Sequence, residues 1–176
     1  ISQVGDQIVL IKDGKKIDSG NVSNILNRSS FVDLTGKFES SSILEGIVCR
    51  HDKNLHITTL DLNGQKLIVP GLPGKLNDIV RVRIRSRDIL LSSSRLKTQI
   101  TENELQGLIY SIEIEKNSAF SELVVVLKNF KNNRKKQKLR VRITTYNLKN
   151  KKFLIHDNVF IYVSSVSIDR QAYQSK

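Results

Sequence analysis

The stretch Leu44-Glu45-Gly46-Ile47-Val48 returns later in the chain as Leu105-Gln106-Gly107-Leu108-Ile109. Two further landmarks recur in the same order: residues 65–69 are matched by 137–141, and residues 77–84 by 156–163. Because self-similarity in a fixed order indicates repeated structural units, the sequence predicts two similar small units in tandem. The first two landmarks lie further apart in the second copy, which predicts longer loops there.

The residues around the landmarks are typical of short strands. Val80, Val82 and Ile84 alternate with arginines, and this period of two places the apolar side chains on one face of a strand. Asn63-Gly64 between two apolar runs is a strong signal for a tight hairpin. Residues 144–152 could form a short helix or a loop. Many short strands with glycine and proline turns predict a mainly β chain that folds as two small Greek-key barrels.

Composition limits the classes of protein that the chain can represent. Its 176 residues allow one or two domains. A unit of about 60 residues is marginally stable alone, so the repeats are expected to pack on each other or on a second copy. A hydrophobic content of 39% without a long apolar run excludes a membrane-spanning helix. The single cysteine, Cys49, allows no internal disulfide, favours the cytoplasm, and is expected to be a small buried residue.

The net charge of +12 raises the question of an anionic partner. Between Leu123 and His156 there is no acidic residue, and eleven basic ones are present. These residues are Lys128, Lys131, Arg134, Lys135, Lys136, Lys138, Arg140, Arg142, Lys149, Lys151 and Lys152. Few aromatic residues are interleaved with them, so a solvated basic loop is favoured over a nucleic-acid site. Attraction to anionic lipid head groups is a further alternative.

Residues 5–26 predict a strand, a tight turn at Asp13-Gly14, a second strand and then a short helix at residues 21–26. This segment resembles the end of the nucleotide-binding domain of ABC-transporter ATPases. The phosphate-binding loop, the acidic strand and the signature motif of that family do not occur in the chain, so we expect no catalytic residues and no ATP hydrolysis. The chain also contains no methionine, which predicts that it is a truncated piece of a longer protein.

The repeats resemble the accessory region of the same family. Residues 67–72 and the run Arg83-Ile84-Arg85-Ser86-Arg87-Asp88-Ile89 are similar to the first accessory repeat of molybdate-importer ATPase subunits. Residues 103–168 resemble the molybdate-binding (Mop) module more loosely. The resemblance implies two tandem OB-like barrels of the Mop/TOBE type, preceded by a short ABC ATPase remnant. It divides the chain into the remnant at 1–26, a linker at 27–42, a first repeat at 43–97 and a second repeat at 98–176.

The same resemblance implies a regulatory module of a molybdate or tungstate importer, which would bind an oxyanion and dimerise. Its partners would be a second copy of the ATPase subunit and the membrane permease subunits, and it would lie in the cytoplasm beside the membrane. Two alternatives remain: a basic barrel that binds nucleic acid through residues 128–152, and a purely structural dimerisation module. No metal site is expected, because the three histidines do not have metal-ligand spacing with Cys49.

The resemblance also implies residues for an oxyanion site, which would combine backbone N–H groups, hydroxyls and cations. The positions that match are Ser40, Ser41, Ser42, Arg85 and Ser86 in the first repeat, and Asn103 and Thr144 in the second. Two positions depart from the family pattern, because Glu102 replaces an arginine and Ser164 replaces a lysine. We therefore expect a site in which Arg85-Ser86 meets the beginning of one repeat, either Ser40–Ser42 or Asn103.

Overall fold

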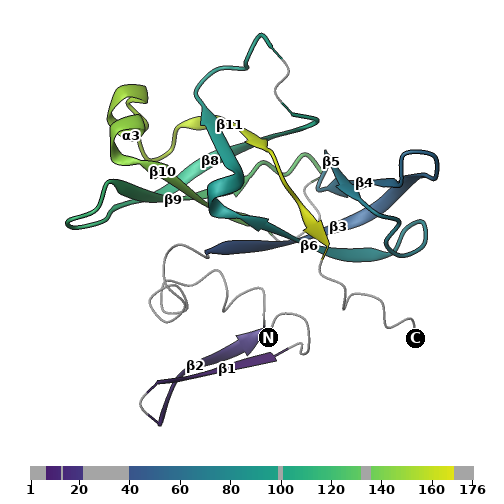
Figure 1. The fold of residues 1–176 in the computed structure, drawn as a ribbon, viewed down its shortest axis with the longest axis horizontal. Coiled ribbons are helices and arrows are strands. Elements are labelled where there is room, and N and C mark those ends of the chain that lie inside the picture. Colours follow the sequence, from purple (N-terminus) through teal and green to yellow (C-terminus); the bar gives the residue numbers. More distant parts are fainter. Residues whose placement is uncertain (1–6, 13, 22–39, 99–100, 132–135, 169–176) are drawn as a thin grey trace.

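The computed structural model describes residues 7–12, 14–21, 40–98, 101–131 and 136–168. Within these residues the chain forms three antiparallel sheets and little helix (Figure 1). Strands β1 (Gln7–Lys12) and β2 (Lys15–Asn21) pair as the predicted hairpin and make a sheet of their own. No helix in the described part of the chain is long and apolar enough to cross a membrane.

The remaining strands form two five-stranded sheets. The first sheet contains β3 (Ser41–Asp52), β4 (Ile57–Leu62), β5 (Gln65–Pro70) and β6 (Ile79–Arg85) from the first repeat, with the strand order β12-β6-β3-β4-β5. The second contains β8 (Asn103–Ile114), β9 (Phe120–Leu127), β10 (Lys138–Thr144) and β11 (Asn158–Val163), with the order β10-β9-β8-β11-β7. The mainly β fold predicted from the sequence is confirmed.

The two repeats exchange their last strands. Strand β7 (Ile89–Ser92) follows β6 after the short 3-10 helix η2 (Ser86–Asp88), but it pairs with β11 of the second repeat. In return, β12 (Ser167–Ile168) follows β11 and pairs with β6 of the first repeat. Each sheet is therefore completed by a strand from the other repeat. The predicted boundary between residues 97 and 98 places β7 in the first repeat by sequence, while β7 belongs to the second sheet by pairing.

Several local predictions are confirmed. Val80, Val82 and Ile84 of β6 are fully buried, while the arginines between them are partly exposed. Asn63 and Gly64 have φ values of 57° and 94°, as a tight hairpin with two left-handed residues requires. The short helix α3 (Thr145–Lys151) lies within residues 144–152, where a helix or a loop was expected.

The prediction for Cys49 is wrong, because this residue is exposed. The pairing of β3 with β4 shifts register between Val48 and Arg50. Such a bulge interrupts the regular alternation of side chains along a strand. Cys49 lies at the bulge, so its burial does not follow from its place beside the buried Val48.

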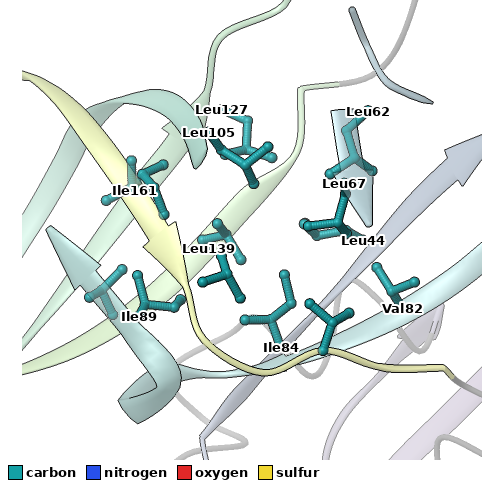
Figure 2. Packing of buried hydrophobic residues seen from close by; sticks show 14 of the residues in the cluster. Leu44, Leu62, Leu67, Val82, Ile84, Ile89, Leu105, Leu127, Leu139 and Ile161 are labelled. Atoms are coloured by element: carbon teal, nitrogen blue, oxygen red, sulfur yellow. The ribbon is translucent and has the colours of Figure 1, made fainter. Parts of the chain in front are cut away.

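One continuous core fills the space between the two sheets. Leu44, Leu62 and Leu67 of the first repeat belong to the same buried cluster as Leu105, Leu139 and Ile161 of the second (Figure 2). Because hydrophobic stabilisation grows with the apolar area removed from water, sharing one core relieves the marginal stability expected of each repeat alone.

Two glutamines at matching landmark positions join the repeats. Gln65 of β5 accepts a hydrogen bond from the backbone N–H of Gln106 (2.6 Å) and donates to the carbonyls of Gln106 (3.0 Å) and Lys128 (2.8 Å). Gln137, just before β10, accepts from the N–H of Glu45 (2.7 Å) and donates to its carbonyl (2.9 Å). Each glutamine thus occupies both backbone groups of the residue before the repeated glycine in the other repeat.

We predict that Gln65→Ala destabilises the fold more than Gln137→Ala. Gln65 is 7% exposed, so its loss leaves buried backbone groups without partners, at a cost of about 1–3 kcal/mol each. Gln137 is less buried, and water can replace part of its bonding. Urea unfolding of the two variants measures the difference in the free energy of unfolding, and equal losses would contradict this account.

Candidate functional site

The edge of β10 lies against the beginning of β3, and we call this contact the β3–β10 seam (Ser40, Ser42, Ser86, Arg140 and Arg142). The backbone N–H of Arg140 donates to the Ser42 hydroxyl at 2.8 Å. Glu45, three residues after Ser42, is hydrogen-bonded to Gln137, three residues before Arg140. The two chain segments therefore run in opposite directions. Continuing this register places Ser40 beside Arg142.

Two buried serine hydroxyls in this seam lack a hydrogen-bond partner among the residues that the structure describes. They are Ser40 Oγ and Ser86 Oγ, and the two side chains are 4% and 1% exposed. The serines are held together by a backbone hydrogen bond from Ser86 N–H to the Ser40 carbonyl, at 2.9 Å. A buried hydroxyl without a partner costs about 1–3 kcal/mol, which a ligand with acceptor oxygens would recover.

The backbone of β10 directs further donors toward the same seam. Residues 137 and 145 form backbone hydrogen bonds on the β9 side of β10, through the pairs Leu127–Gln137 and Thr145–Ala119. Successive residues of a strand turn their backbone groups to opposite edges, so the even-numbered residues of β10 face away from β9. Arg140 does so in its bond to Ser42, and the N–H of Arg142 has the same direction.

The arginine side chains of the seam enter a buried charge network. Arg140 Nη1 lies 3.2 Å from Glu122, and Arg142 makes two hydrogen bonds to Glu115, at 2.7 and 3.2 Å. Arg142 Nη1 is also 3.7 Å from Glu122, and its guanidinium stacks over the Phe120 ring at 4.6 Å. All four charged side chains are less than a tenth exposed, so two positive and two negative charges balance inside the protein.

Burial raises the pKa of Glu122, and the attraction of Arg140 and Arg142 offsets only part of that rise. The neighbouring carboxylate of Glu115 adds to it, because two negative charges close together favour protonation of one of them. Glu122 therefore takes up a proton at a higher pH than an ordinary glutamate does.

The raised pKa predicts how stability depends on pH. Because folding favours protonated Glu122, its contribution is fully present below the usual glutamate pKa and is lost as the pH rises through the raised value. Glu122→Gln is neutral at every pH and should lack this decline, when free energies of unfolding in urea are measured from about pH 4 to about pH 8. The exposed Glu102→Gln is the control and should keep the wild-type slope. An unchanged slope in Glu122→Gln would disprove the assignment.

The structure brings together three of the predicted site residues, Ser40, Ser42 and Ser86, and gives the others separate roles. Ser41 accepts from Arg83 Nε at 2.9 Å, and Arg85, its partner across the strands, is exposed. Thr144 caps α3 by accepting from the N–H of Asn147 at 3.1 Å. Asn103 lies in a different seam, where its amide bonds both backbone groups of Ile68, at 2.7 and 2.9 Å.

Sequence reasoning missed the burial of Arg140 and Arg142, which it counted with the solvated basic run. The available signal was their alternation with Leu139, Val141 and Ile143, which is the pattern used to recognise β6. The run is also paired elsewhere, because Lys131 bonds Asp61 at 2.7 Å and Lys138 lies 4.2 Å from the centre of the Tyr110 ring. Residues 132–135 lie outside the described residues.

Comparison with known proteins finds sequence relatives of the chain among molybdenum import ATP-binding proteins. The molybdenum import ATP-binding protein ModC of Rhizobium johnstonii is 34% identical over 112 residues, covering 62% of this chain and 30% of that protein. The ModC proteins of Mesorhizobium japonicum and Haemophilus influenzae are 25% and 26% identical, over 97% and 94% of this chain. The chain resembles molybdenum import ATP-binding proteins. The resemblance predicted from its sequence is therefore confirmed, although the chain spans less than half the length of each of these relatives. No family model matches it.

A solved structure of a molybdate-binding protein has a similar fold. The cytoplasmic molybdate-binding protein ModG, with molybdate bound, superimposes with a TM-score of 0.59. The match covers 72% of this chain and 94% of that one, with 14% sequence identity. At this identity the likeness concerns the fold alone, and it confirms the predicted Mop-type architecture of the two repeats.

Proposed function

We propose that this chain is a regulatory module of the ATP-binding subunit of a molybdate or tungstate importer, and that it binds the oxyanion in the β3–β10 seam. The observation that carries the proposal is the pair of buried hydroxyls, Ser40 Oγ and Ser86 Oγ, without a hydrogen-bond partner in the described structure. A tetrahedral dianion offers four acceptor oxygens, which suit the two buried hydroxyls of Ser40 and Ser86. The relatives support this ligand class, since they are named for molybdenum import.

Regulation of a transporter by such a module requires a difference between two states. A bound oxyanion shifts an equilibrium only if its affinity differs between those states. The seam lies between the two repeats, so a ligand there would contact both and would resist any change in their packing. We propose a second copy of the subunit and the membrane permease subunits as the partners on which this acts, in the cytoplasm beside the membrane. The chain itself is not expected to hydrolyse ATP.

The test is calorimetric titration of the chain with molybdate, tungstate, sulfate and phosphate. We expect heat of binding with molybdate and tungstate, and a loss of affinity of at least about a hundredfold in Ser40→Ala/Ser86→Ala. That figure corresponds to two hydrogen bonds to a charged acceptor, each contributing about 1.5 kcal/mol or more. Ser94→Ala, an exposed serine outside both seams, should bind like the wild type.

The absence of heat with every oxyanion would show the proposed function to be wrong. A purely structural dimerisation module would then remain, and sedimentation of the chain without ligand would detect its self-association. A thermal melt of each variant confirms that a loss of binding does not reflect a loss of fold.

A further inference from the structure

The two repeats make two matching seams, because each landmark contact occurs twice. The β5–β8 seam (Ile68, Pro70, Thr101 and Asn103) corresponds to the β3–β10 seam. Asn103 contacts the backbone of Ile68 as Ser42 contacts that of Arg140. Gln65 meets Gln106 three residues away, as Gln137 meets Glu45. The same register therefore places Thr101 beside Pro70, as it places Ser40 beside Arg142.

The hydroxyls at the beginning of the two seams differ in their hydrogen bonding. Ser40 Oγ is buried and without a hydrogen-bond partner in the described structure. Thr101, its counterpart, donates its hydroxyl to the carbonyl of Val163 at 2.7 Å and accepts from the N–H of Asn103 at 3.3 Å. Thr101 is thus bonded within its own repeat, and its hydroxyl proton is already used in the bond to Val163.

The serine that follows the last long strand of each repeat also differs between the two seams, in its burial and hydrogen bonding. Ser86 follows β6 and is 1% exposed, with a hydroxyl that lacks a partner in the described structure. Its counterpart Ser165 follows β11 and is exposed to solvent. A hydroxyl in water can bond water freely, so it gains little from an anion.

The backbone donors complete the contrast. The residue of the β5–β8 seam that matches Arg142 is Pro70, which has no N–H. Asn103 also places its amide on both backbone groups of Ile68, where the shorter Ser42 accepts one hydrogen bond from Arg140. Exposed Glu102 adds a negative charge beside the second seam.

We infer that the chain holds a single oxyanion, in the β3–β10 seam, and that the β5–β8 seam is a closed structural joint that binds none. This inference rests on the proposed function and adds its stoichiometry and the reason for it. The two seams match in position, but in the second the threonine is bonded to Val163, the serine is exposed and Pro70 has no N–H.

The experiment measures the number of oxyanions bound per chain, with tungstate in calorimetry and by metal analysis after gel filtration. We expect one per chain in the wild type. Ser40→Ala/Ser86→Ala should weaken binding at least about a hundredfold. The matched pair Thr101→Val/Ser165→Ala should keep one oxyanion with an affinity within about threefold of the wild type, about 0.7 kcal/mol.

Three outcomes separate the two proposals. Two oxyanions per chain, or a loss of binding in Thr101→Val/Ser165→Ala equal to that in Ser40→Ala/Ser86→Ala, would overturn the inference of a single site while leaving oxyanion binding intact. No binding by the wild type would overturn the proposed function itself. Because Thr101→Val removes an internal hydrogen bond, Ser165→Ala alone serves as the second matched variant if the double variant does not fold.

Discussion

The structure depends on the reciprocal joining of two repeats that are each too small to close a core. Each repeat sends its last strand to the other sheet, and each sends a glutamine to the backbone of the other repeat. The glutamine bonds are made at Glu45 of β3 and Gln106 of β8, just before these strands begin to pair with β4 and β9. The exchange therefore joins the sheets and merges their cores into one cluster, so neither repeat can separate without exposing both.

Reciprocal joining also gives a physical reason for placing the proposed ligand site at a seam. Inside a sheet, backbone donors are paired with neighbouring strands, and the buried cluster between the sheets consists of hydrophobic side chains. At a seam the two strands meet through side chains, so a hydroxyl such as Ser42 or an amide such as Asn103 decides whether one or both backbone groups are occupied. The short Ser42 side chain bonds one backbone group of its partner strand, whereas the longer amide of Asn103 bonds two.

Local structure was largely predictable, while the pairing of the repeats was not. The alternation in β6 and the Asn63-Gly64 turn are properties of adjacent residues, and both appear as expected. The exchange of β7 and β12 is a choice between two sheets that each would accept the strand, and no local pattern encodes that choice. For the site, the resemblance selected Ser40 and Ser86, but residue types alone could not separate them from Ser41, which bonds an arginine outside the seam.

The charge network beneath the β3–β10 seam limits how the seam can recognise an anion. Arg140 and Arg142 lie close enough to supply positive charge, yet Glu115 and Glu122 balance them one for one. An incoming dianion would therefore meet a nearly neutral environment, so hydroxyls and N–H dipoles must provide the affinity. Because the pKa of Glu122 is raised, a proton taken up there would leave the arginines in excess and favour the anion. At the proposed oxyanion site, the network would link occupancy to protonation through a carboxyl that the oxyanion need not touch.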